Sequence, residues 1–173
     1  AFEAGDIIAE VRGRSVSLLK GERTALNFLQ RMSGIATKTR RFVAAVTGTG
    51  AKILDTRKTT PSLRRLEKYA VRMGGGENHR SSLSDMVLIK DNHLALVGSI
   101  SEAVRRAREK LGRGALIEVE VADFVAAREA VAAGANRVML DNMPLRRMKP
   151  VVRWLKGNVP VEVTGKENFE LVR

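Results

Sequence analysis

The chain has 173 residues, no cysteine, and 31 Lys and Arg residues against 19 Asp and Glu, which gives a formal net charge of +12. This length can form one hydrophobic core, and the lack of thiols excludes a disulfide framework, a thiolate zinc site and a cysteine nucleophile. No run approaches the roughly 20 apolar residues that a membrane-spanning helix needs. We therefore expect a soluble, cytoplasmic protein with a surface or cleft that attracts anions.

The first 46 residues predict a hairpin followed by helix. Two short β-like runs, residues 7–11 and 15–19, lie on either side of Gly13, which is typical of a β-hairpin. From residue 22 to about 46, apolar residues recur at helical spacing around Gly34. This spacing predicts one long helix or two helices in sequence.

Beyond residue 50 a pattern repeats, in which a short apolar β-rich run leads into a polar cluster and then a helical segment. The apolar runs are residues 53–54, 86–89, 116–121, 137–140 and 159–163. Helices are predicted over residues 63–73, from Ser99 or Ser101 to about 111, over 124–133 and over 145–155. The alternation predicts an α/β fold with parallel strands that are buried on both faces.

The polar clusters all follow strand ends. In a parallel barrel or an open α/β sheet, the carboxyl ends of the strands form the binding site, so the clusters should converge there. An eight-stranded barrel needs about 200 residues or more. We therefore expect a smaller or an incomplete barrel.

The basic character of the chain fits two classes of partner. Nucleic acid is one, and phosphorylated or multiply carboxylated small molecules are the other. Only 4% of the residues are aromatic, too few to suggest base-stacking platforms, and the basic residues are dispersed along the chain. Small anionic molecules are the favoured partners, and a basic nucleic-acid binder stays as an alternative.

Eight segments, in order and at compatible spacing, resemble the quinolinate phosphoribosyltransferase family over residues 5–165. They are ERTALN (22–27), SGIAT (33–37), DTRKTTP (55–61), KYAV (68–71), GGGENHR (74–80), IKDNH (89–93), EVEV (118–121) and LDN (140–142). The resemblance implies an incomplete parallel β/α barrel (TIM-like) over residues 21–173. Residues 1–20 would be the trailing edge, a β-hairpin remnant, of an N-terminal α/β sandwich domain, with the chain truncated at both ends.

The same resemblance implies an enzyme that transfers a phosphoribosyl group from phosphoribosyl pyrophosphate to quinolinate. The products would be nicotinate mononucleotide, pyrophosphate and carbon dioxide, on the route to NAD, with Mg²⁺ bound to the donor. It also implies a homo-oligomer, with a dimer favoured, and no membrane partner. In this dimer Arg23 would reach the neighbouring subunit's site.

By the family pattern, the site residues divide by substrate. Quinolinate would be bound by Arg23, Thr56, Arg57, His79, Arg80 and Lys90. The donor and its Mg²⁺ would be bound by Lys58, Lys90, Glu120, Asp141, Thr164 and Gly165, of which Glu120 and Asp141 would hold the metal through substrate or water. Lys58, Lys90, Glu120 and Asp141 would act in catalysis. Guanidinium groups suit carboxylates because they donate two parallel hydrogen bonds, and lysines serve phosphates as compact charges.

Several alternatives stay open. Glu118 and Glu120 share one side of a strand, so either could be the functional carboxylate, although the family pattern selects Glu120. His79 and His93 are a weak zinc signal. Residues 74–76, three glycines, fit a phosphate cradle or a flexible turn. Lys166 departs from the family's phosphate loop. The chain could also be a shortened, inactive member that binds anionic metabolites or assembles with other subunits, or a relative with another aromatic acid as substrate.

Overall fold

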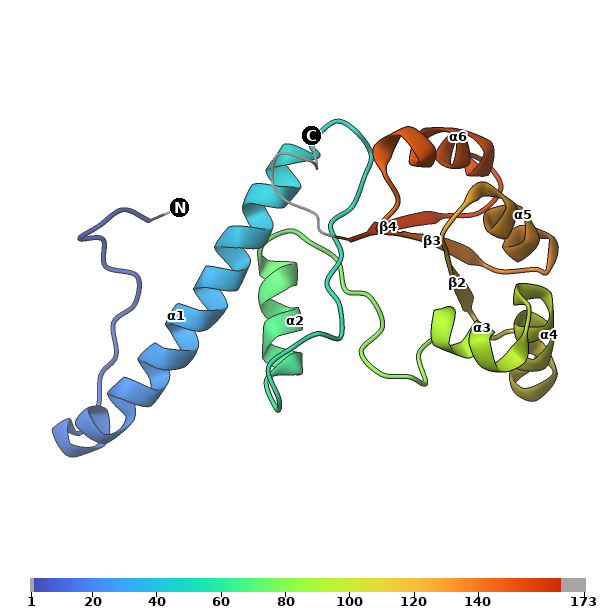
Figure 1. The fold of residues 1–173 in the computed structure, drawn as a ribbon. Helices are drawn as coiled ribbons and strands as arrows, with labels where there is room; N and C mark the ends of the chain where they lie inside the picture. The colour runs from blue at the N-terminus through green and yellow to red at the C-terminus, as the bar shows by residue number, and fades with distance from the viewer. Residues whose placement is uncertain (1, 166–173) are drawn as a thin grey trace. The chain divides into compact units, whose positions relative to one another are not determined.

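The computed structural model describes residues 2–165 and forms two compact units, residues 1–78 and 79–173. The first unit consists mainly of two helices, and the second is a β/α unit around a parallel sheet (Figure 1). In the described part of the chain, no helix combines the length and the apolar character that a membrane crossing requires. The division at residue 20 into sandwich and barrel parts stays a prediction.

The first unit begins with a helix where a hairpin was expected. Helix α1 (Ser15–Ala45) has 31 residues and runs through Gly34 without a break, and residues 2–14 contain no strand. The hairpin prediction was therefore wrong. Residues 15–19 are the first turns of α1, and a five-residue apolar run cannot be told from the start of a helix by its periodicity. Of the two options for the following segment, a single long helix is the observed one.

Helix α2 (Arg64–Met73) packs against α1, and glycines permit the close approach. A Cβ atom on Gly74 would lie 2.4 Å from the Ala36 carbonyl oxygen and 2.6 Å from the Thr39 Cβ. On Gly76 it would lie 2.8 Å from the Val71 Cγ1. Two of the three glycines at residues 74–76 are therefore packing residues, which is neither the phosphate cradle nor the flexible turn that their sequence suggests.

Gly74→Ala should lower the free energy of unfolding by about 1–3 kcal/mol, because the new methyl group meets backbone atoms that cannot move aside. Gly21→Ala is the matched control. Gly21 lies inside α1, and a Cβ atom there would have nothing within 4 Å, so alanine should stabilise the helix by up to about 1 kcal/mol. Urea unfolding of both variants measures the difference. Equal effects of the two substitutions would contradict the close packing at Gly74.

The second unit is a set of β/α repeats. In the part that the structure describes, up to residue 165, its four parallel strands lie in chain order, and helices α3 to α6 gather on one side of the sheet in Figure 1. An order that never reverses is that of a β/α barrel, whereas a doubly wound sheet reverses. The elements are β1 (Val87–Ile89), α3 (Asp91–Val97), α4 (Ile100–Leu111), β2 (Ile117–Val121), α5 (Phe124–Ala132), β3 (Arg137–Asp141), α6 (Leu145–Leu155) and β4 (Val161–Thr164).

These elements confirm the predicted α/β fold and, within one or two residues, the predicted helices α2, α4, α5 and α6. The hydroxyl of Ser99 caps α4 by accepting a hydrogen bond from the Glu102 amide at 3.2 Å. The apolar run at residues 53–54 forms only a single parallel bridge, between Leu54 and Glu77. Helix α3 was not predicted, because its seven residues are too few to show helical periodicity.

The two faces of the sheet differ in character. Ile117, Val119 and Leu140 lie on the face that packs against the helices, and each is fully buried. The opposite face carries polar side chains from three neighbouring strands, namely Glu118, Glu120, Arg137, Asp141, Glu162 and Thr164, and the strand register pairs Glu118 with Arg137 and Asp141 with Thr164. The predicted burial on both faces is confirmed for β2 and β3, whose residues are all buried or partly buried. The face opposite the helices is nevertheless polar, and it contains several of the predicted site residues.

Candidate active site

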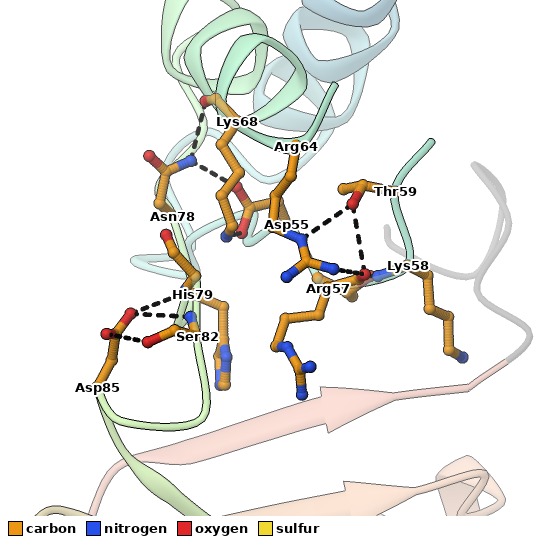
Figure 2. Close-up of polar contacts among 12 residues, drawn as sticks. Asp55, Arg57, Lys58, Thr59, Arg64, Lys68, Asn78, His79, Ser82 and Asp85 are labelled. Carbon is orange, nitrogen blue, oxygen red and sulfur yellow. Dashed lines mark hydrogen bonds and ion pairs between the residues drawn. The ribbon is translucent and has the colours of Figure 1, made fainter. Parts of the chain in front are cut away.

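In the first unit, a buried ion pair fixes the start of the segment that carries Arg57. Lys68 on α2 bonds to the carboxylate of Asp55, and only 5% and 7% of these two side chains are exposed. The side-chain amide of Asn78 donates to the same carboxylate and, at 2.9 Å, to the Lys68 carbonyl oxygen (Figure 2). Asp55 directly follows the bridge at Leu54, so these contacts set the direction in which the chain leaves that bridge.

Side chains of the first turn of α2 hold the rest of this segment. Arg64 donates to the Thr59 hydroxyl at 3.0 Å and to the Arg57 carbonyl oxygen at 3.1 Å (Figure 2). The carboxylate of Glu67 accepts a hydrogen bond from the Thr60 amide at 3.2 Å and another from the Arg31 Nε on α1 at 3.0 Å. Burial pushes the pKa of Glu67 upward, but the hydrogen bonds from Arg31 and Thr60 outweigh it and leave the pKa lowered. Glu67 is therefore an ionised anchor of the segment.

Fixed in this way, the segment presents two cations. The Nε of Arg57 is buried, and it has no hydrogen-bond partner among the described residues. Lys58 is exposed, and its backbone amide donates to the Thr56 hydroxyl at 3.0 Å. A buried guanidinium nitrogen without a partner is costly unless a ligand supplies an acceptor. Arg23 lies on the exposed surface of α1, and the contacts within this unit give it no role.

In the second unit, four predicted site residues lie in a row at the carboxyl ends of neighbouring strands. Lys90 follows β1 and bonds to the carboxylate of Glu120 on β2. Asp141 ends β3 and is paired in register with Thr164, which ends β4. The structure thus brings Lys90, Glu120, Asp141 and Thr164 together along one edge of the sheet, as the sequence predicted.

The residues after β3 and β4 approach each other closely. The Asn142 amide donates to the Thr164 carbonyl oxygen at 2.8 Å, and its side-chain amide donates to Asp141 at 3.0 Å. A Cβ atom on Gly165 would lie 3.0 Å from the Asn142 Oδ1. Gly165 therefore suits the tight contact at this edge, while the predicted change of geometry at Lys166 lies outside the described residues.

The two histidines have different surroundings. The His93 Nδ1 accepts a hydrogen bond from the Lys90 amide at 2.9 Å, so His93 caps helix α3. His79 lies among charged side chains on the polar face of the sheet. Its Nε2 is 2.9 Å from the Glu118 Oε2 and 3.2 Å from the Glu162 Oε2. Neither contact was predicted, although the two-residue spacing of Glu118 and Glu120 places both on this face.

Burial and mutual repulsion perturb the two carboxyl groups beside His79. Burial is the main cause that raises the pKa of Glu118, whose side chain is fully buried. Burial, together with the charge of Glu118, raises the pKa of Glu162 to about 7. Arg137 offsets part of the repulsion, because its guanidinium lies 3.6 Å from Glu162 and 4.0 Å from Glu118.

The pKa of Glu162 predicts a pH dependence of stability. The folded state takes up this proton near pH 7, whereas the unfolded chain takes it up near the ordinary value of 4.5. Between these values the folded state binds more protons, so the free energy of unfolding should fall as the pH rises from about 4.5 to about 7. Glu162→Gln should flatten this slope in urea unfolding measured across the window. The same slope in parent and variant would contradict the assignment.

Arg80 and the residues after it form a fixed turn at the start of the second unit. The Arg80 Nη1 donates to the Met86 carbonyl oxygen at 3.0 Å. The carboxylate of Asp85 accepts hydrogen bonds from the Ser81 and Ser82 amides at 2.7 Å and 3.1 Å and from the Ser82 hydroxyl at 2.6 Å. Figure 2 shows the bonds between Ser82 and Asp85. The turn leads the chain from His79 and Arg80 into strand β1.

A singly wound parallel β/α unit with cations and carboxylates at its strand ends is typical of β/α-barrel domains, whose binding sites lie at the carboxyl ends of the strands. The family model of the quinolinate phosphoribosyl transferase C-terminal domain matches residues 35–172, and that of its N-terminal domain matches residues 1–33. The chain belongs to the quinolinate phosphoribosyl transferase family.

Individual relatives agree with this family. A Bacillus subtilis protein, named a probable carboxylating nicotinate-nucleotide pyrophosphorylase, is 50% identical over 96% of this chain and 57% of its own length. The human protein of that name is 42% identical over 91% of this chain and 55% of its own. The crystal structure of NadC from Streptococcus pyogenes matches with a TM-score of 0.94 and 46% identity, over 99% of this chain and 60% of that one. The chain thus spans a little over half the length of these relatives.

Proposed function

We propose that this chain provides part of the active site of a carboxylating nicotinate-nucleotide pyrophosphorylase. The reaction joins quinolinate to the phosphoribosyl group of phosphoribosyl pyrophosphate and yields nicotinate mononucleotide, pyrophosphate and carbon dioxide. The observation that carries the proposal is the row of Lys90, Glu120, Asp141 and Thr164 at the strand ends, in a chain whose relatives have this name. A row of cations and carboxylates suits a dianionic acceptor and a diphosphate donor.

Quinolinate has two adjacent carboxylates, and the chain offers several cations for them. Arg57 is the strongest candidate, because its buried Nε has no partner among the described residues. His79, Arg80 and Lys90 are the candidates in the second unit, and Arg23 and Thr56 are those in the first. Nicotinate has one carboxylate and would engage fewer of these groups, so the proposal includes selectivity for the dicarboxylate.

The residues present also fit Mg²⁺ bound to the donor. Glu120 and Asp141 supply oxygen ligands on the same face of neighbouring strands. Two carboxylates are too few for a metal site made by protein alone, but Mg²⁺ is commonly held by one or two carboxylates together with substrate phosphates. When bound, the ion would neutralise charge on the departing pyrophosphate. Lys58, Thr164 and Gly165 are the further candidates for contact with the donor's phosphates.

The chemistry needs no covalent intermediate with the protein. The pyridine nitrogen forms a bond to C1 of the ribose as the bond from C1 to pyrophosphate breaks. The carboxylate next to the nitrogen then leaves as carbon dioxide, its bonding electrons stay on the ring carbon, and that carbon takes up a proton. Glu120 and Asp141 would stabilise positive charge on the ribose, while Lys58 and Lys90 would stabilise the negative charge that develops opposite it.

We also propose a homodimer in which Arg23 contacts the partner's substrate. Arg23 is exposed on α1, and large apolar side chains on the same helix are exposed as well, among them Leu19 at 73% and Phe28 at 42%. Apolar side chains that line one exposed helix are typical of a surface that a second subunit covers. A cytoplasmic location fits substrates of central metabolism.

The test is product formation from quinolinate, phosphoribosyl pyrophosphate and Mg²⁺, followed as nicotinate mononucleotide by chromatography. We expect turnover by the parent and a loss of about 100-fold or more in kcat with Glu120→Gln, which keeps the shape of the side chain and removes its charge. The exposed Glu109→Gln is the control and should retain full activity. Saturable quinolinate binding without any product would instead support the inactive, anion-binding alternative.

A further inference from the structure

The ring of His79 lies against carboxylates from two strands of the second unit. Glu118 comes from β2 and Glu162 from β4, and the exposed fractions of the three side chains are 6% for His79, 0% for Glu118 and 12% for Glu162. One ring nitrogen, Nε2, faces both carboxylates. Contacts with buried side chains on the polar face of the sheet, and not with solvent, therefore set the orientation of this ring.

The two carboxylates do not contact the ring in the same way. The Glu118 Oε2 lies 2.9 Å from Nε2 and forms a hydrogen bond with it. The Glu162 Oε2 lies 3.2 Å from the same nitrogen, yet it has no hydrogen-bond partner among the described residues. The arrangement that we favour places the hydrogen on Nε2, which donates it to the Glu118 carboxylate.

Charged side chains surround the ring. Arg137 lies 4.0 Å from Glu118 and 3.6 Å from Glu162, and its positive charge offsets part of the repulsion between these two carboxyl groups. The hydrogen bond between Nε2 and Glu118 is the short polar contact that fixes the ring in this cluster.

We propose that Glu118 is a positioning residue for His79, which fixes the plane of its ring and keeps the hydrogen on Nε2. The inference rests on the proposed function, in which His79 contacts the dicarboxylate substrate. Two carboxylates on the same face of strand β2 then have different partners. Glu120 bonds to Lys90, whereas Glu118, two residues earlier, bonds to His79. The two carboxylates thus orient two different side chains of the site.

A bound cation is the competing account of the same cluster. Ligand atoms of His79, Glu118 and Glu162 all lie within 4.8 Å of one another, as they would around a metal ion. The guanidinium of Arg137 lies beside both carboxylates and already supplies positive charge there. A second cation between them would be repelled, so the hydrogen-bonded arrangement is favoured.

Nitrogen NMR of the histidine rings tests the proposal on the whole chain. The sequence has only two histidines, and His93 serves as an internal reference because its Nδ1 accepts from the Lys90 amide. Glu118→Gln is compared with the matched variant Glu162→Gln, and thermal melting verifies that both fold. We expect a protonated Nε2 in His79 of the parent, a changed His79 signal in Glu118→Gln, and a retained Nε2 hydrogen in Glu162→Gln. The His93 signals should not move in either variant.

Calorimetry with quinolinate completes the test. Glu118→Gln should weaken binding by about 10-fold, because the Gln oxygen can still accept a hydrogen bond but no longer carries the charge that strengthens it. Glu162→Gln should weaken it less. A parent chain that binds no quinolinate would overturn the proposed function, and the NMR comparison would still decide whether Glu118 fixes the ring. Three results would each overturn the positioning role. They are an Nε2 that carries no hydrogen in the parent, His79 signals that are the same in Glu118→Gln as in the parent, and His79 signals that shift when EDTA is added.

Discussion

Lys68→Met should lower the free energy of unfolding by about 3–5 kcal/mol, because it removes one partner of a buried ion pair and leaves the other charge in place. The side chains of Lys68 and Asp55 are 5% and 7% exposed, so water cannot replace the lost ammonium group. Met retains most of the apolar stem, which limits the effect to the charge. Urea unfolding of the parent and variant gives the difference directly.

Arg65→Met is the matched control for this experiment. Arg65 lies on the same helix, three residues before Lys68, and it is exposed. Its replacement should change the free energy of unfolding by no more than about 0.5 kcal/mol. A loss of stability in Arg65→Met as large as that in Lys68→Met would show that the cost comes from helix α2 in general and not from the buried pair.

Arg57→Ala should weaken quinolinate binding by about 2–5 kcal/mol, the range for removing one partner of a hydrogen-bonded charge pair in a buried site. The Nε of Arg57 is buried and has no hydrogen-bond acceptor among the described residues. A carboxylate of the substrate would supply this acceptor. Arg57→Lys keeps the charge but cannot donate two parallel hydrogen bonds, so we expect an intermediate loss. Calorimetry measures both, and unaltered affinity in Arg57→Ala would contradict this role.

Local sequence features were sufficient to predict most of the second unit. Strand β3 is a short apolar run bounded by polar residues, β2 alternates branched apolar residues with Glu118 and Glu120, and helix α4 follows Ser99, whose side chain caps it. Such signals depend on neighbours in the chain and survive folding. The parallel arrangement predicted that the polar clusters meet at the strand ends, whereas the choice of Lys90, Glu120, Asp141 and Thr164 came from the family resemblance.

The errors came from contacts between residues that are distant in the chain or from runs too short to interpret. Residues 15–19 have a β-like composition, but their continuation into a 31-residue helix determines their structure. The two-residue alternation of a strand made Glu118 one of two possible site residues, and its role beside His79, 39 positions away, is visible only in the structure. The spacing of glycines 74–76 likewise gave no sign of the close packing against α1.

The contacts around Asp55 could not be predicted for the same reason. Arg64, Glu67 and Lys68 lie on one face of α2, a pattern that is usually a solvated helix surface. In the structure this face binds the segment from Asp55 to Thr60, and the backbone that carries Arg57 and Lys58 is held by it. A charged helix face therefore acts as a support for the cations of the site.

Calorimetric titration of the unmodified chain with quinolinate and, separately, with nicotinate is the most direct test of a dicarboxylate pocket. The two ligands differ by one carboxylate, so their comparison isolates the paired recognition that we assign to the cations of this chain. We predict saturable heat with quinolinate and much weaker heat with nicotinate. Equal binding of both ligands, or binding of neither, would contradict a dicarboxylate pocket in this chain.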